Sequence, residues 1–202
     1  MSVPPKTVEF WYDFASADSH PVAQLIGRRA ADAGVAVRWR PFRVAPVLRR
    51  REEREDMPPP GDDFQHEYWR QFVEACDRAG VRGRRPSHHP RDTIPALRAA
   101  LACEAEGLDP ASFARAVFDA NYVKDWDVSD PTVLGEILVE IDYDAARVLA
   151  RARDLAVRAQ LDANTAEALR QEFFDAPTVI GPDGERHWGL DGLPGALRDA
   201  AA

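Results

Sequence analysis

Residues 7–20 read TVEFWYDFASADSH, and this stretch decides the fold. Most of the first eight residues are β-branched or aromatic, which is typical of a buried strand. A short polar turn follows, and then Pro21, which the first turn of a helix tolerates because the N–H group there needs no helical partner. Apolar residues recur at helical spacing as far as Gly34, a residue type common just beyond a helix end. The stretch therefore predicts a strand that leads through a polar turn into a helix.

The sequence returns to strand after this helix. Residues 35–42, VAVRWRPF, alternate apolar and polar side chains. Two strands joined by one helix of this length form a right-handed parallel unit, so we expect β-α-β here. Residues 49–61 then combine a charge run, RRREERE, with the breaker MPPPG, and this composition predicts a linker or a mobile loop.

The middle of the chain has helical periodicity throughout. Thr93 and Asn164 are expected to cap two of the helices, the second through the capping-box pattern Asn164-x-x-Glu167. The predicted helices cover residues 62–79, 93–107, 110–122, 129 onward, 144–159 and 164–173. We expect no strand in this region.

The last thirty residues turn back to strand. Residues 178–180 and 185–188 flank the turn 182–184 and predict a hairpin, and a helix follows over about 191–200. Strands at both ends with helices between them indicate one α/β sheet domain, residues 1–60 and 174–202, interrupted by a helical insertion, residues 61–173.

Composition excludes several classes of protein. Hydrophobic residues make up 45% of the 202 residues, enough for a packed core, and the formal net charge of −8 argues against nucleic acid as a partner. No stretch has the ~20 apolar residues that span a membrane, and the first residues lack the apolar core of a signal peptide, so we expect a cytoplasmic protein without a membrane partner. The two cysteines, Cys76 and Cys103, form no CxxC motif and no metal-site pattern; we interpret them as small buried hydrophobes and expect no metal.

The tripeptide Ala176-Pro177-Thr178 stands immediately before the third predicted strand. A β-α-β unit and a β-β-α unit with X-Pro-Thr at this place have the layout of the thioredoxin fold. In proteins of that fold the proline is cis and lies opposite the N-terminus of the first helix, so we expect Pro177 to be cis and close to Ser16. The alternative is a trans proline that begins an edge strand.

With this layout, five segments resemble one branch of the fold: FWYDFASADSH, WRPFRVAP, TIPALRAALACEAEG, FARAVFDANYVKDWDVSDP and FFDAPTVIGPDGERHWGLDGL. The chain is similar to 2-hydroxychromene-2-carboxylate isomerases and kappa-class glutathione transferases, both in the DsbA-like branch. The resemblance covers nearly the whole chain, and it rests on the combination of segments rather than on one motif.

In that family the CxxC motif of thioredoxin is replaced by SxxS, and residues 16–19, Ser-Ala-Asp-Ser, match it. The resemblance implies that the hydroxyl of Ser16 supports the thiolate of glutathione, as the catalytic residue. A free thiol has a pKa near ~8.5, and a hydroxyl donor at a helix N-terminus stabilises its anion. The alternative is that Ser16 or Ser19 caps the helix, which we expect of Ser19.

Ala17 and Asp18 replace the family's usual Pro and Tyr. If Asp18 points inward, its carboxylate repels a thiolate and raises the pKa of the thiol; otherwise it faces solvent at the helix N-terminus. His20 flanks the site and is expected to titrate there. Asp18, Ser19 and His20 are the candidate residues of the substrate pocket.

The resemblance also implies contacts with glutathione. The backbone of Ala176, beside Pro177, matches the position that binds the cysteinyl part. Asp191, with Leu190 next to it, matches the residue that receives the γ-glutamyl amine, and its alternative is a helix cap. The loop after the second strand offers Arg49 or Arg50 for the carboxylates, whose alternative is a solvated face, and Asp56 near an expected Asn.

The expected function is a glutathione-dependent isomerase that acts on a small aromatic carboxylate, as a homodimer. Another low-molecular-weight thiol, or none, is the alternative cofactor. A kappa-like glutathione transferase or peroxidase, and a non-catalytic small-molecule-binding protein, are the alternative functions. Serines at both CxxC positions exclude thiol–disulfide exchange by the protein itself.

Overall fold

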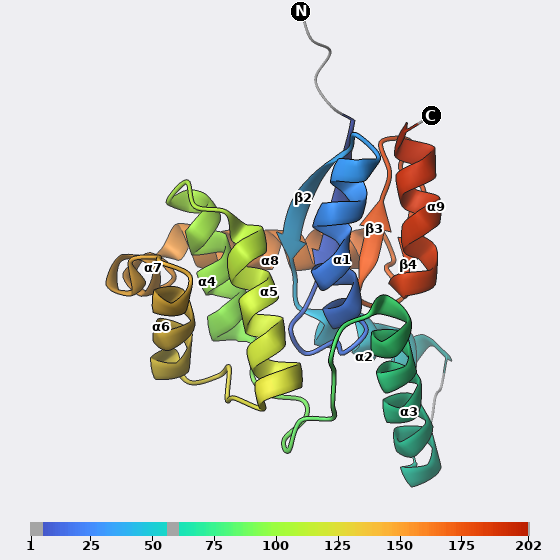
Figure 1. Cartoon of the computed structure of the whole chain (residues 1–202), viewed down its shortest axis with the longest axis horizontal. Helices are drawn as coiled ribbons and strands as arrows, with labels where there is room; N and C mark the ends of the chain where they lie inside the picture. Colours follow the sequence, from blue (N-terminus) through green and yellow to red (C-terminus); the bar gives the residue numbers. More distant parts are fainter. Residues whose placement is uncertain (1–5, 56–60, 202) are drawn as a thin grey trace, which may run out of the picture.

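The computed structural model describes residues 6–55 and 61–201. Its sheet has the strand order β2-β1-β3-β4 (Figure 1). β1 (Thr7–Tyr12) pairs in parallel with β2 (Ala36–Pro41), and β3 (Thr178–Ile180) is antiparallel to both β1 and β4 (Arg186–Trp188).

Two helices complete the sheet unit. α1 (Ser19–Asp32) connects β1 to β2, and α9 (Gly189–Ala201) follows β4; the two helices lie side by side against the sheet (Figure 1). The β-α-β and β-β-α units are those of the predicted thioredoxin-like α/β fold, which is confirmed. α9 begins two residues before the predicted start.

β1 divides the core between the two faces of the sheet, because successive side chains of a strand point in opposite directions. Val8, Phe10 and Tyr12 belong to the large core with α1, α9 and the inserted helices. Trp11 belongs to a second core on the other face, with residues of α2 (Val44–Glu55) and α8 (Leu155–Arg170). α8 therefore packs against the sheet unit itself.

The described chain between residues 61 and 173 is helical and contains no strand, as predicted; the domain boundaries themselves stay a prediction. Its helices are α3 (Asp62–Ala79), α4 (Ile94–Ala105), α5 (Pro110–Asp119), the π-helix η1 (Ala120–Lys124), α6 (Pro131–Glu140), α7 (Ala145–Arg151) and α8.

The charge run after β2 is a helix, and the predicted linker is wrong up to Glu55. Val44 and Val47 of α2 are buried in the second core, which holds one side of the helix. Arg and Glu are good helix formers, and those of α2 other than Arg51 are exposed. The rest of the predicted linker, including Asp56, lies outside the described residues except for Gly61.

One predicted helix cap is also wrong, and a second is right in its position only. Asn164 begins no helix: it lies inside α8, buried, and its Nδ2 donates to the carbonyl of Pro41 at 2.8 Å. Thr93 occupies the predicted N-cap position of α4, but its side chain makes no capping bond; its hydroxyl donates instead to Asp13. In both cases the polar side chain bonds a residue distant in the sequence instead of the end of a helix.

None of the described helices is long and apolar enough to cross a membrane.

Candidate active site

Ser16 lies in the turn between β1 and α1, where the sheet and the inserted helices meet. Its Oγ donates a 2.7 Å hydrogen bond to the carbonyl oxygen of Ala176, which precedes Pro177. The Ala176–Pro177 peptide bond is cis. The predicted cis proline beside Ser16 is therefore confirmed, although 160 residues separate the two groups along the chain.

Ser16 opens onto a cleft of about 540 Å³. This volume is within the range of about 300–1,000 Å³ that is common for small-molecule sites. The β1–α1 turn, α2, α3 and the loop before α4 form its walls. The described lining residues are Ala15, Ser16, Val44, Leu48, Arg51, Glu52, Gly61, Phe64, Gln65, Tyr68, His89, Pro90 and Asp175. The cleft is thus an apolar space with a few polar groups near Ser16.

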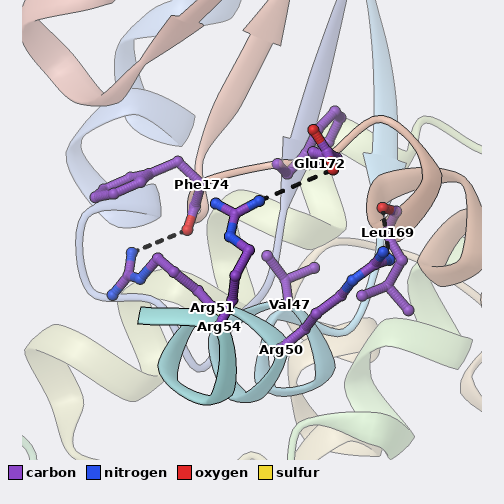
Figure 2. A pocket seen from close by; sticks show the side chains of 8 residues that line it. Val47, Arg50, Arg51, Arg54, Leu169, Glu172 and Phe174 are labelled. Atoms are coloured by element: carbon purple, nitrogen blue, oxygen red, sulfur yellow. Dashed lines mark hydrogen bonds and ion pairs between the residues drawn. The ribbon is translucent and has the colours of Figure 1, made fainter. Parts of the chain in front are cut away.

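Arg51 of α2 brings a positive charge to the cleft. Its Nη1 donates to the carbonyl of Phe174 at 3.0 Å, and its guanidinium lies 4.3 Å from the centre of the Phe174 ring (Figure 2). The same Nη1 is 3.9 Å from Oδ2 of Asp175. These contacts hold the guanidinium at the cleft wall with most of its side chain buried.

Two carboxylates near Ser16 have raised pKa values. Burial raises the pKa of Asp175 to about 6, against the lowering effects of the Ala176 N–H and of Arg51. Burial, and then the charge of Asp175, raise the pKa of Asp18 to about 7. Asp18 occupies the N-cap position of α1 without a capping bond from its side chain. The Asp18 carboxyl group is therefore much harder to ionise than an exposed aspartate.

These features agree with the match of the sequence to a protein-family model. The model of the DsbA-like thioredoxin domain matches residues 7–199. The chain belongs to this DsbA-like family.

Three solved structures show how far this DsbA-like fold is shared. A 2-hydroxychromene-2-carboxylate isomerase has a TM-score of 0.77 at 19% identity, over 93% of this chain and 90% of that one. The probable DsbA oxidoreductase SCO1869 from Streptomyces coelicolor has a TM-score of 0.72 at 21% identity, over 96% of this chain and 89% of that one. The cytosolic disulfide reductase DsbM from Pseudomonas aeruginosa has a TM-score of 0.68 at 18% identity, over 96% of this chain and 95% of that one. Comparison with curated proteins found no match. At these identities the structures share a fold with this chain.

Two predicted pocket residues of the DsbA-like domain are buried and are not among the described residues that line the cleft. Ser19 is the first residue of α1, completely buried, and its Oγ has no partner; Asp18 takes the cap position that we expected of Ser19. His20 is buried as well, 2.7 Å through Nε2 from the carbonyl of Arg82. Burial lowers the pKa of His20, so the ring stays neutral near pH 7.

The predicted cofactor contacts of this DsbA-like domain are spread out. Asp191 lies in the first turn of α9, exposed, with Oδ1 3.4 Å from Nη2 of Arg78, and Leu190 packs against the large core; neither lines the cleft. Arg49 is exposed, and Arg50 donates to the carbonyl of Leu169 at 3.2 Å (Figure 2). Arg51, the next residue, is the arginine that reaches the cleft.

The backbone of Ala176 is at the predicted place, and both of its polar groups are engaged. The carbonyl accepts from Ser16, and the N–H donates to Oδ1 of Asp175 at 2.7 Å. The binding roles given to Ala176, Pro177, Leu190, Asp191 and Arg49 stay predictions, and Asp56 lies outside the described residues.

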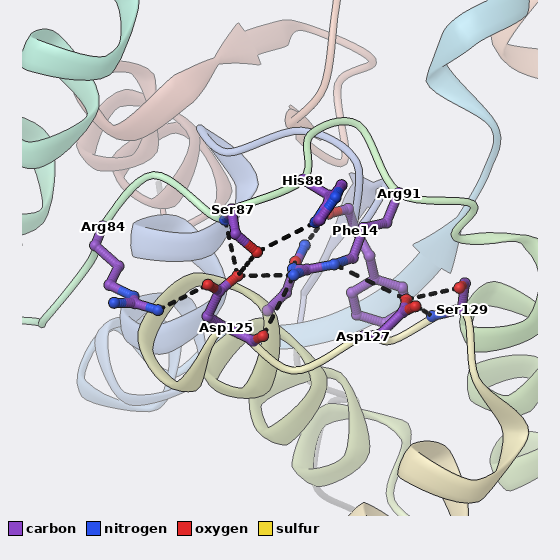
Figure 3. A network of polar contacts seen from close by, with 9 residues as sticks. Phe14, Arg84, Ser87, His88, Arg91, Asp125, Asp127 and Ser129 are labelled. Atoms are coloured by element: carbon purple, nitrogen blue, oxygen red, sulfur yellow. Dashed lines mark hydrogen bonds and ion pairs between the residues drawn. The ribbon is translucent and has the colours of Figure 1, made fainter.

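Sequence reasoning missed the groups that hold the Ser16 turn. The carbonyl of Phe14 accepts from Nδ2 of Asn121 at 3.2 Å and from the hydroxyl of Tyr122 at 3.0 Å, both in the π-helix η1. Asn121 is held in turn by a hydrogen bond from Arg91. Arg91 also donates to Asp125 (Figure 3). No local pattern marks these residues, because their partners lie about a hundred residues away.

Two cleft residues from the insertion were also missed. Burial raises the pKa of Tyr68 well above its usual value. His89, which we had not assigned to the site, lines the cleft; burial, and then the charges of Arg85 and Arg91, lower its pKa to about 4. Both side chains are therefore neutral hydrogen-bonding groups at neutral pH.

Proposed function

We propose that this DsbA-like protein is a glutathione-dependent isomerase whose substrate is a small aromatic carboxylate. The observation that carries the proposal is the place of Ser16: the residue lines the cleft just before α1, and its hydroxyl bonds the carbonyl of the cis Ala176–Pro177 bond. An O–H donor at a helix N-terminus stabilises a thiolate.

The protein's own thiols do not serve this site. Serines occupy both positions of the CxxC motif, and the chain has two cysteines, Cys76 and Cys103. Both are buried and unpaired, and burial raises the pKa of each to about 12. Thiol–disulfide exchange needs a thiolate that reaches its partner. Any sulfur chemistry at Ser16 therefore requires a small thiol from solution.

The groups around the cleft fit such a thiol. The Ser16 hydroxyl donates to the Ala176 carbonyl in this structure and would turn its proton to the sulfur when a thiol binds, and Arg51 supplies a guanidinium for a carboxylate. When bound, glutathione supplies a sulfur nucleophile that adds to a conjugated carbon and leaves after rotation about the former double bond, so that substrate and product are isomers and the thiol is regenerated. The protein's part is to hold the sulfur as its anion and to orient the substrate.

The cleft walls support the substrate class. Leu48, Phe64 and Tyr68 offer apolar and aromatic surface on two sides, and Arg51 is a buried cation within the same space. A planar apolar body that carries a carboxylate matches this combination.

Asp18 favours a second candidate, a binding protein without catalysis. Its carboxylate lies two residues from Ser16, and when ionised it disfavours a thiolate there. The transferase alternative differs in its product, because it releases a thiol conjugate rather than an isomer.

The test is the isomerisation of 2-hydroxychromene-2-carboxylate with and without glutathione, followed by the change in its ultraviolet spectrum. We expect turnover that saturates with glutathione and leaves the glutathione concentration unchanged, with at least about a hundredfold loss in Ser16→Ala. Saturable glutathione binding without turnover would support the binding protein instead. Consumption of glutathione with release of a conjugate would support the transferase.

A further inference from the structure

Asp13, at the end of β1, is a buried carboxylate three residues before Ser16. Only 3% of the residue is exposed. Its Oδ1 accepts from the N–H of Ala15 at 3.0 Å and from the hydroxyl of Thr93 at 2.7 Å, and its Oδ2 accepts from the N–H of Val44 at 2.8 Å. Its backbone carbonyl accepts from the N–H of Ser16 at 3.1 Å.

The donors come from three parts of the fold. Ala15 belongs to the turn that carries Ser16, Val44 is the first residue of α2, and Thr93 stands directly before α4. α2 carries Arg51 on the cleft wall. One carboxylate thus joins the Ser16 turn, the helix with the cleft cation, and the inserted helices.

Fold stability alone does not account for a carboxylate at this place. The pKa of Asp13 is raised, because the effect of burial is larger than the lowering by its hydrogen bonds and by the charge of Arg43. The hydrogen bonds that lower it come from Thr93, Ala15 and Val44. Burying a charge costs free energy, and well-packed apolar residues often serve a core equally well. Three directed hydrogen bonds, by contrast, fix three segments relative to one another.

We propose that Asp13 is the positioning residue of the site: by accepting these bonds it fixes the Ser16 hydroxyl and the α2 helix with Arg51 at one separation across the cleft. The positioning itself is a property of the structure. Its effect on a bound thiol rests on the proposed function.

The first measurement is amide hydrogen exchange, followed residue by residue by NMR, in Asp13→Asn. An amide side chain has one acceptor oxygen and turns an NH₂ group toward a donor, so it cannot bond both the turn and α2, and the two segments lose their connection. We expect the amides of Ala15, Ser16 and Val44 to exchange at least about tenfold faster than in the wild type, while Phe10 in β1 keeps its rate.

Asp109→Asn is the matched control. Asp109 also accepts from two backbone N–H groups and a hydroxyl, those of Ala111 and Ser112, but at the N-terminus of α5. We expect faster exchange at Ala111 and Ser112 and no change at Ser16. Equal acceleration at Phe10 and Ser16 in Asp13→Asn, or none at either, would overturn the proposal.

A second pair of variants covers the case in which Asp13→Asn does not fold. Thr93→Val removes the hydroxyl at nearly constant volume, and Thr93→Ser keeps it. We expect Thr93→Val to accelerate exchange at Ala15 and Ser16 and Thr93→Ser to restore the wild-type rates. The same rates in both would contradict the role of Asp13.

The functional arm measures the pKa of bound glutathione from its thiolate absorbance. We expect Asp13→Asn to raise this pKa, and to have no further effect in the presence of Ser16→Ala, because the two residues act through one hydroxyl. Additive effects would contradict positioning. If the wild type binds no glutathione, the proposed function fails, and the exchange data still decide the role of Asp13.

Discussion

At the scale of single residues, the site consists of groups whose ordinary behaviour is changed by where the backbone places them. Ser16 follows the family pattern, and its partner, the carbonyl of Ala176, could be predicted because X-Pro before a strand marks this place in the fold. The sequence places Asp18 next to the Ser16 turn, but it does not determine whether the Asp18 side chain points inward or faces solvent. Its pKa of about 7 comes from burial and from Asp175, a neighbour that only the folded chain supplies.

The raised pKa of Asp18 predicts a pH-dependent stability. An unfolded Asp titrates near ~3.9, so between about pH 4 and pH 7 the folded state binds more protons, and stability falls as the pH rises. Asp175, with a pKa of about 6, acts in the same direction. We expect Asp18→Asn to equal the wild type near pH 4 and to exceed it by about 1–3 kcal/mol at pH 8, a range that allows for screening by solvent.

Urea unfolding at several pH values measures this difference. Asp62→Asn, an exposed position in the first turn of α3, is the control for removal of one negative charge. A constant difference between Asp18→Asn and the wild type across pH 4–8 would show that the Asp18 carboxylate is solvated.

At the scale of secondary-structure elements, hydrophobic periodicity predicted most of the strands and helices. The charge run of residues 49–55 led to a wrong prediction of a linker. The aromatic residues of β1 and the alternation in β2 gave those strands directly. α2 was missed because RRREERE has the composition of a solvated segment, although Val44 and Val47 already stood three residues apart. The break between α7 and α8 was misplaced because Asn164, a capping residue by type, is used to bond Pro41 across the core.

The helical form of α2 decides which arginine serves the cleft. In Arg51→Met we expect a Kd for benzoate, the probe for an aromatic carboxylate, at least about tenfold higher than in the wild type, because a charge-assisted bond is lost. Loss of the Arg51 charge is also expected to raise the pKa of Asp175 further.

Isothermal titration calorimetry with benzoate measures the first effect. Arg49→Met is the matched control: it removes the same charge two positions away, where the side chain is exposed, and we expect an unchanged Kd. Equal weakening in both variants would indicate a general electrostatic effect and not a carboxylate contact at Arg51.

At the scale of the whole molecule, the sheet brings together the turn after β1 and the segment before β3, and the insertion holds them. β1 lies between β2 and β3, so the turn after β1 and the segment before β3 meet at one edge of the sheet. This meeting could be predicted from the order of elements. The bonds of Asn121 and Tyr122 to Phe14, and of Thr93 to Asp13, could not, since they depend on how the inserted helices pack.

The most direct test of the central claim is the pKa of glutathione bound to the wild type and to Ser16→Ala, from thiolate absorbance against pH. We expect the bound thiol to have a pKa below the ~8.5 of a free thiol in the wild type, and about one unit higher in Ser16→Ala. Loss of the buried bond to Ala176 is also expected to lower the free energy of unfolding of Ser16→Ala by about 1 kcal/mol. Ser129→Ala, in an exposed loop, controls for loss of a hydroxyl. The same thiol pKa in the wild type and Ser16→Ala would show that the Ser16 hydroxyl serves only its bond to Ala176 and not a thiolate.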